Sequence, residues 1–303
     1  QGSQKIGMGA DLAGASSHAR DVFAEVDDAL SLKLSAIMRE GPEDQLTLTE
    51  SAQPAIMANA IATLRVLERE FGVTLADHAG CVAGHSLGEY TALCGVGAFS
   101  LADTARLLKL RGSAMQAAVP VGVGGMAALL GADIDKAAAL AGAAAQGQIC
   151  EVANDNDPGQ VVISGHLEAI ERAIELAKDH GIKRGVRLPV SAPFHCSLMQ
   201  PAADRMAEAL GAMPPGALAV PLYANVTAAR ITDPAQERDL LVQQVTSRVR
   251  WRESVLAMVE GGAEQFVEIG GKVLTPMVTR TAPDASATSL LTMADLETFA
   301  KES

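Results

Sequence analysis

The sequence predicts an α/β protein in which a small unit is inserted into a larger one. Two observations support this prediction. A strand, a sharp turn and a helix follow one another around residue 86, and a distinct set of six elements occupies residues 119–189. At 303 residues the chain is long enough for one large domain or two smaller ones. We therefore expect residues 1–118 and 190–303 to build the large subdomain, and residues 119–189 the small one.

The turn around residue 86 has the sequence of a nucleophile elbow. The stretch Gly84-His85-Ser86-Leu87-Gly88 has the pattern Gly-x-Ser-x-Gly, with a short apolar run before it and a helical pattern after it. On such a turn the serine hydroxyl projects away from the sheet, and the first N–H groups of the helix can stabilise an oxyanion. Flanking glycines let the neighbouring backbones approach. We therefore expect an α/β-hydrolase-like large subdomain with a parallel sheet, and Ser86 as a nucleophile.

Hydrophobic periodicity places the other elements of the large subdomain. The predicted helices are 17–32, 51–71, one starting at 89, 101–115, 197–210, 236–245 and 252–260. Pro54 falls in the first turn of the second helix, where proline is tolerated. The predicted strands are 77–83, which leads into the elbow, 220–224 and 265–269. The last twenty residues are expected to form helix and loop.

The inserted unit has the element order of a ferredoxin-like subdomain. Its predicted strands are 126–130, 150–153, 160–164 and 183–188, and its predicted helices are 133–145 and 167–180. The second and third strands are expected to be joined by the turn-rich residues 154–159. The order β-α-β-β-α-β is that of the split βαβ, or ferredoxin-like, fold.

Composition and charge exclude several classes of function. The formal net charge of −12 argues against nucleic acid, because a phosphate-binding surface needs clustered Lys and Arg. No apolar run approaches the ~18 residues of a membrane span and no signal peptide is recognisable, so we expect a cytoplasmic protein without a membrane partner. The four cysteines have no metal or disulfide spacing, so we expect no metal site.

A serine hydroxyl is a poor nucleophile at neutral pH and needs a base. The candidates are His18, His78, His85, His166, His180 and His195. His85 adjoins Ser86 in a tight turn where successive side chains diverge, whereas His195 follows a segment with two prolines, where the chain re-enters the large subdomain. A lone histidine there can also be a packing or capping residue, but next to an elbow serine we favour the base. No carboxylate stands out as a third member, and Cys196 lacks an elbow.

Arg111 has two interpretations. It lies near the end of the predicted helix 101–115, where a solvated or C-capping arginine is common. Alternatively, its planar guanidinium could hold a substrate carboxylate through two parallel hydrogen bonds.

Six motifs, in order along the chain, resemble those of the malonyl-CoA:acyl carrier protein transacylases and of the acyltransferase domains of polyketide and fatty acid synthases. The motifs are residues 1–4 with 7–9, 84–90, 111–112, 154–165, 192–195 and 268–274. The resemblance implies that Ser86 is acylated and that His195 is the base, oriented by a main-chain carbonyl near Gln244 in place of a carboxylate. It also implies an oxyanion hole made by the backbone N–H groups of Leu87 and Gln1.

The resemblance further implies how the acyl group is bound. Arg111 would hold the free carboxylate of the malonyl group, and Phe194 would crowd an α-methyl group. Asn154 and Asn156 would lie near the pantetheine entrance. Family members have a strand and Phe-Pro-Gly before their first glutamine, so we expect the numbering to start inside the natural protein.

The expected activity is ping-pong transfer of malonyl from malonyl-CoA, through malonyl-serine, to the phosphopantetheine thiol of acyl carrier protein for fatty acid synthesis. No cofactor is implied, because CoA is a substrate, and we expect a monomer. The alternatives are an acyltransferase acting in trans in a polyketide pathway, a serine thioesterase or hydrolase, and a non-catalytic docking module.

Carrier proteins are typically acidic, and this chain is acidic too, so docking would need a local basic patch. Lys183, Arg184 and Arg187 form the densest candidate. Charged residues that protect an edge strand are the other interpretation of these three.

Overall fold

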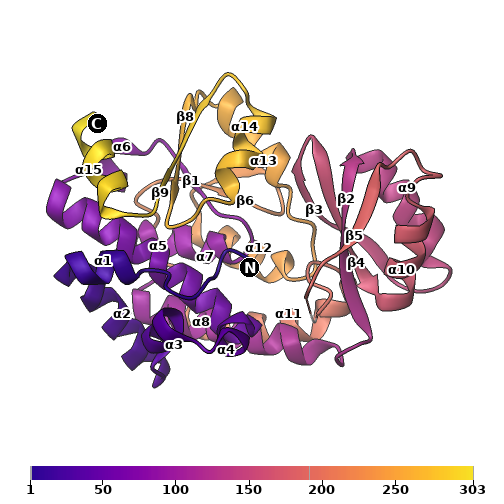
Figure 1. The fold of residues 1–303 in the computed structure, drawn as a ribbon, viewed down its shortest axis with the longest axis horizontal. Coiled ribbons are helices and arrows are strands. Elements are labelled where there is room, and N and C mark those ends of the chain that lie inside the picture. Colours follow the sequence, from indigo (N-terminus) through magenta and orange to yellow (C-terminus); the bar gives the residue numbers. More distant parts are fainter. Residues whose placement is uncertain (1, 191, 303) are drawn as a thin grey trace.

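The computed structural model describes residues 2–190 and 192–302, which form a helix-rich large subdomain and a sheet-based small one (Figure 1). The first part of the large subdomain is helical. Its elements are α1 (Ala10–Ala15), α2 (Ser17–Leu30), α3 (Leu34–Glu40), α4 (Glu43–Thr47), α5 (Thr49–Phe71) and α6 (Leu75–His78). The N-terminus of α2 is fixed by Ser16, whose side chain accepts the N–H groups of His18 and Ala19.

The long helix α5 starts two residues earlier than its sequence pattern predicts. It begins at Thr49, so Pro54 lies in the second turn, not the first. There the proline removes one backbone hydrogen bond from the helix. The helix ends at Phe71, and the following Gly72 takes the left-handed conformation, with φ 75°, that glycine adopts without a steric cost.

The strand that leads into the elbow is shorter than predicted. Residues 75–78 form α6, because Thr74 caps a helical turn by accepting the N–H of Asp77 at 3.2 Å. Of the predicted strand, only Val82–Ala83 pairs as a strand, β1. It pairs in parallel with β6 (Leu222–Ala224), which pairs antiparallel with β7 (Ala229–Ile231).

A second short sheet joins β8 (Gln265–Ile269) in parallel to β9 (Ser286–Leu290). The last twenty residues therefore contain a strand that the expectation of helix and loop missed. The reason is its composition, since Ser286, Thr288 and Ser289 weaken the apolar signal of a strand held by pairing with β8.

The remaining helices of the large subdomain pack on apolar cores. They are α7 (Leu87–Gly95), α8 (Leu101–Ala118), the 3₁₀ turn η1 (Ser197–Met199), α11 (Gln200–Ala212), α12 (Pro234–Gln244), α13 (Trp251–Glu260), α14 (Leu274–Thr281) and α15 (Met293–Glu302). They pack on the main apolar core of the subdomain, except α13 and α14, which form a separate apolar cluster with residues around the short sheets. In Figure 1, α5, α7 and α8 lie together beneath the short sheets.

The small subdomain is a four-stranded antiparallel sheet with two helices, at the right of Figure 1. Its elements are β2 (Gly124–Ala132), α9 (Ile134–Ala145), β3 (Cys150–Asp157), β4 (Gly159–His166), α10 (Leu167–Leu176) and β5 (Arg184–Arg187). The strand order β3-β4-β2-β5 is the ferredoxin-like order, which confirms this part of the predicted fold class. The sheet and its helices enclose their own apolar cluster. The boundaries 119 and 189 stay predictions.

The stretch predicted as a turn after 153 belongs instead to β3 and joins the two subdomains. Asp155 N–H donates to the Val249 carbonyl and Val249 N–H to the Ala153 carbonyl, both at 2.9 Å. The carboxylate of Asp155 accepts three hydrogen bonds of 2.9–3.1 Å from Arg252. We call residues 153–157 the seam. These hydrogen bonds with the large subdomain satisfy polar groups of the seam, so this polar sequence can adopt an extended backbone.

Candidate active site

Ser86 occupies a strained turn between β1 and α7. Its φ of 55° and ψ of −111° are rarely adopted by residues other than glycine, and such strain concentrates at functional sites. A Cβ at Gly84 would lie 1.9 Å from the carbonyl oxygen of Gly88, so the turn can close only with glycine at position 84. At Gly88 itself a Cβ would meet open space. Only the first of the two motif glycines is therefore required by backbone packing.

Asn225 holds this turn from the chain that follows β6. Its side-chain oxygen accepts the N–H of Ser86 at 2.7 Å, and its side-chain N–H donates to the Gly84 carbonyl at 2.7 Å. It is fully buried. Asn225 was not among the residues predicted from the sequence. The available signal was its place directly after a strand that ends beside the elbow strand.

His195 meets Ser86 from a loop of the large subdomain. Its Nε2 lies 2.8 Å from Ser86 Oγ, and its Nδ1 lies 2.8 Å from the main-chain oxygen of Gln244. Gln244 is the last residue of α12, where carbonyl groups have no partner within the helix and can accept a hydrogen bond. With the Nδ1 proton donated to that carbonyl, the Nε2 lone pair faces the serine hydroxyl.

Burial and the neighbouring guanidinium of Arg111 lower the pKa of His195 to about 3. The imidazole is therefore neutral at neutral pH, which is the form that can accept a proton from Ser86. The backbone of His195 has a φ of 59°, so both members of the pair sit at left-handed positions. The segment before it packs closely on the small subdomain, since a Cβ at Gly124 would lie 2.4 Å from the ring of Pro193.

Arg111 lies inside α8, not at its end, and is only 1% exposed, so the interpretation as a solvated or capping residue is wrong. Its Nη1 donates to Gln53 Oε1 at 2.9 Å, and its Nη2 donates to Gln244 Oε1 at 2.8 Å and to Ser86 Oγ at 3.1 Å. Its guanidinium carbon lies 5.6 Å from the centre of the Tyr90 ring. A buried cation is thus held beside Ser86 by neutral hydrogen-bond partners, which leaves its charge available to an anion.

The other residues of the expected acyl site lie close by in the chain. Leu87 is the first residue of α7, so its N–H belongs to the turn whose N–H groups have no partner within the helix. Phe194 is buried directly before His195. Gln1, expected as the second oxyanion donor, lies outside the described residues.

The two expected entrance residues are buried in the seam. Asn156 accepts a hydrogen bond of 2.8 Å from His85 Nε2, and burial lowers the pKa of His85 to about 4, so this ring is neutral. The His85 ring also lies 5.7 Å from that of Trp251. Asn154 bridges to Val249. His85, beside Ser86, therefore contacts the small subdomain, whereas His195 comes from the large one.

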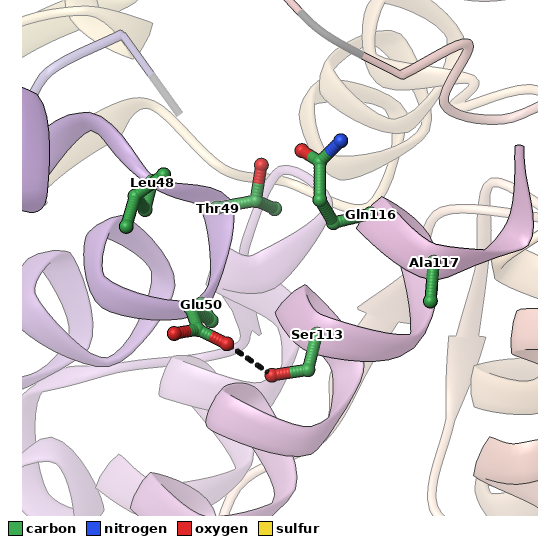
Figure 2. Close-up of a pocket in the computed structure, with 6 residues that line it drawn as sticks. All are labelled: Leu48, Thr49, Glu50, Ser113, Gln116 and Ala117. Carbon is green, nitrogen blue, oxygen red and sulfur yellow. Dashed lines mark hydrogen bonds between the residues drawn. The ribbon is translucent and has the colours of Figure 1, made fainter. Parts of the chain in front are cut away.

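A separate pocket of about 250 Å³ opens between the start of α5 and the end of α8. It is lined by Leu48, Thr49, Glu50, Ser113, Gln116 and Ala117. Figure 2 shows the side chains of Thr49 and Gln116 on one side of it, and the 2.6 Å hydrogen bond from Ser113 to Glu50 on the other. None of the residues described above as bonded to Ser86 lines this pocket.

Three further observations concern metal ions, membranes and Cys196. Within residues 2–190 and 192–302, no cluster of three or more His, Cys, Asp or Glu residues is arranged to hold a metal ion. No helix in the same two stretches is long and apolar enough to cross a bilayer. The thiol of Cys196 donates to the Pro193 carbonyl at 3.1 Å and takes no part in the contacts of Ser86.

A strained serine, a neutral histidine and a buried arginine at the serine oxygen define a site for acyl transfer through a covalent intermediate. The comparison with protein families agrees. Residues 1–295 match the family described as acyl transferase domain, and the chain belongs to that family.

Individual relatives have names more specific than that of the family. The chain is 43% identical to the malonyl CoA-acyl carrier protein transacylase of Escherichia coli strain K12 over 291 residues, which are 96% of this chain and 93% of the relative. It is 42% identical to the transacylase of the same name from Bacillus subtilis, over 92% of this chain and 87% of the relative.

Solved structures agree with this assignment. An acyl-carrier-protein S-malonyltransferase from Bartonella henselae has a TM-score of 0.97 and 51% identity, covering 100% of this chain and 96% of that one. A malonyl-transacylase solved with a type II PKS acyl-carrier protein has a TM-score of 0.96 and 40% identity, covering 100% and 97%.

Proposed function

We propose that this chain transfers a malonyl group from malonyl-CoA to the phosphopantetheine thiol of an acyl carrier protein in fatty acid synthesis. The observation that carries the proposal is the buried Arg111 guanidinium, 3.1 Å from Ser86 Oγ. An acyl chain on that oxygen that ends in a carboxylate would find a cation within reach. The names of the relatives support the same substrate and acceptor.

The proposed first half-reaction acylates Ser86. As Ser86 Oγ attacks the thioester carbonyl, His195 Nε2 takes its proton, and the Gln244 carbonyl stabilises the resulting imidazolium through Nδ1–H. The N–H of Leu87 would stabilise the oxyanion, and we assign the second donor to Gln1. The C–S bond breaks, and the imidazolium returns its proton to the departing CoA thiolate.

The second half-reaction runs the same steps with a different thiol. His195 takes the proton of the phosphopantetheine thiol, whose sulfur attacks the malonyl-serine ester. Ser86 leaves with that proton, so the enzyme returns to its starting state. No cofactor enters either step, because the thioester itself supplies the driving force.

Three further assignments complete the proposed site. Arg111 binds the malonyl carboxylate, and Phe194 crowds an α-methyl group, which favours malonyl over methylmalonyl. Asn154 and Asn156 line the path of the pantetheine arm. We further propose that residues 119–189 fold as the small subdomain and that the protein is a cytoplasmic monomer.

A carrier protein of polyketide synthesis is a second candidate acceptor, favoured by one observation. A similar structure was solved with a type II PKS acyl-carrier protein. Comparing the rate of malonyl transfer to purified holo carrier proteins of the two kinds separates these possibilities.

We propose that the carrier protein docks on the basic patch Lys183, Arg184 and Arg187. All three are exposed, on or beside the edge strand β5, and Arg187 lies 3.4 Å from Glu171. Reversing Lys183 and Arg184 to Glu should raise KM for the carrier protein and weaken its dependence on salt. If neither changes, the patch only protects the strand edge.

Brief mixing with malonyl-, methylmalonyl- or acetyl-CoA, followed by intact-protein mass spectrometry, tests the proposed function. We expect one malonyl group per chain, with little methylmalonyl or acetyl adduct. Ser86→Ala should gain no mass. Release of free malonate at the transfer rate would instead indicate a hydrolase, and an unmodified parent protein would indicate a docking module.

A further inference from the structure

Two buried glutamates lie behind the elbow and have no part in the reaction described above. Glu89 is in the first turn of α7, three residues after Ser86, and Glu237 is in the first turn of α12. Both side chains are completely shielded from solvent. Glu89 Oε1 and both carboxyl oxygens of Glu237 have no N–H donor among the residues that the structure describes.

Glu89 is linked to the nucleophile through one residue. Its Oε2 accepts the main-chain N–H of Asn225 at 2.8 Å. The side chain of Asn225 in turn bonds Ser86 N–H and the Gly84 carbonyl, each at 2.7 Å. The carboxylate of Glu89 therefore holds Asn225 in place, and Asn225 in turn holds the turn at Ser86.

Both carboxyl groups are fully buried, and three of their four oxygens have no donor among the described residues. Two such groups that interact cannot both be ionised, because each lacks water and repels the other. Burial raises the pKa of Glu237 far above its ordinary value, and the charge of Glu89 raises it further. A protonated Glu237 would donate a hydrogen bond to Glu89, so burial raises the pKa of Glu89 less than it raises that of Glu237. The two carboxyl groups then titrate as a pair.

The groups that act on this pair include one cation. Arg111 on α8 attracts the charge of Glu89, and the main-chain N–H of Asn225 donates a hydrogen bond to it. Tyr90 on α7 is the other titratable group nearby, and its own pKa is raised, chiefly by burial, so it stays neutral. One proton on the pair leaves one negative charge, which equals the single positive charge of Arg111.

We propose that Glu89 and Glu237 are positioning residues for the acylation of Ser86, and that they share one proton. The remaining negative charge holds Asn225 under the elbow and balances buried Arg111 until an acyl carboxylate arrives. This inference rests on the proposed role of Ser86 as the acylated residue.

Glutamine substitutions test the shared proton, since they keep shape and hydrogen bonding. In Glu237→Gln the amide donates to Glu89 as the acid did, and the single negative charge stays. In Glu89→Gln the amide oxygen accepts from Asn225, its N–H donates to Glu237, and Glu237 takes over the charge. The double variant keeps the hydrogen bond but has no negative charge opposite Arg111.

The measurement is the single-turnover rate of malonyl adduct formation in the parent, both single variants and the double variant. We expect the rate of adduct formation in each single variant to be about threefold to tenfold lower than in the parent. The rate of adduct formation in the double variant should be lower than the product of the two single-variant effects predicts, by on the order of tenfold to a hundredfold. Effects that simply multiply would overturn the shared proton, as would a Glu237→Gln loss as large as that of the double variant.

The pH dependence of stability gives a readout that packing alone would not change. Glu237 binds its proton more tightly in the folded than in the unfolded chain, so its contribution to stability falls as pH rises. The stability of Glu237→Gln relative to the parent should therefore increase between about pH 5 and about pH 9 in urea unfolding. A difference independent of pH would overturn the proposal.

The Ser86→Ala variant separates this inference from the proposed function. If Ser86→Ala still gains a malonyl group, the proposed function fails. If that variant gains none and the glutamine effects multiply, only the role of the glutamate pair fails.

Discussion

The large and small subdomains contribute to the active site in different ways. Within the described residues, the hydrogen bonds to the side chains of Ser86 and His195 come from the large subdomain: Arg111, the Gln244 carbonyl and the pair itself. The small subdomain contributes the seam, whose Asn156 bonds His85, the residue before Ser86. The groups bonded to the Ser86 and His195 side chains thus lie on one subdomain, and the other contacts the residue before Ser86.

The first prediction concerns the turn at Ser86 in the large subdomain, and its two glycines serve as a matched pair of variants. Gly84→Ala should abolish adduct formation, because the new Cβ would overlap the Gly88 backbone. Gly88→Ala should fold and keep acylation within about tenfold of the parent, since its Cβ meets open space. Equal losses in both variants would show that the crowding at position 84 does not set the turn.

The second prediction concerns the base. His195→Ala should slow acylation of Ser86 by roughly two to four orders of magnitude, the usual contribution of a positioned base. Because the pKa of His195 is lowered to about 3, protonation should not slow the parent between about pH 8 and about pH 5. Quenching the reaction at set times and measuring the adduct by intact-protein mass spectrometry across this pH range checks both the rate loss and the pH dependence. A titration near the ordinary histidine pKa would contradict the neutral, buried imidazole.

The third prediction concerns Arg111 and acyl selectivity. Arg111→Ala should reduce malonyl transfer by about two decades in kcat/KM and improve acetyl relative to malonyl, because a bidentate charged pair is lost. Arg111→Lys should recover only part, since an ammonium is a point charge. Removing this cation should also raise the pKa of His195, so any acid limb moves to higher pH. Equal losses with both acyl groups would assign Arg111 a structural role only.

The fourth and smallest effect on the chemistry is expected at the seam. Arg252→Ala leaves the carboxylate of Asp155, which is 1% exposed, without its cation, and should lower the free energy of unfolding by about 3–5 kcal/mol. Acylation in the folded variant should stay within about threefold of the parent. Arg238→Ala, which breaks an exposed pair with Asp239, is the control and should cost at most about 1 kcal/mol. A large loss of acylation without a loss of stability would give the seam a part in the chemistry.

Local patterns predicted the elbow and the small subdomain well. A serine between glycines, after an apolar run and before a helix, constrains its own conformation, and six elements in one order specify the ferredoxin-like sheet. The partners of the elbow could not be predicted in this way. Gln53, Asn225 and Glu237 reach the site from distant helices and loops, and no local period marks them.

The errors have a common physical cause. The expected turn after residue 153 and the missed strand β9 are both polar stretches that extended pairing with another segment stabilises. The long strand expected before the elbow is replaced by α6, where the Thr74 cap outweighs a weak apolar pattern. Secondary-structure propensity describes a segment in isolation, whereas the structure of these segments depends on the residues that they pair with or that cap them.

The most direct test follows the malonyl group itself. The protein is mixed with malonyl-CoA, freed of nucleotide by rapid gel filtration, and then given a holo acyl carrier protein while both masses are followed. The account predicts that one malonyl group leaves Ser86 and appears on the carrier thiol, with no transfer from Ser86→Ala. Malonate released to water, or transfer that needs no prior adduct, would contradict it.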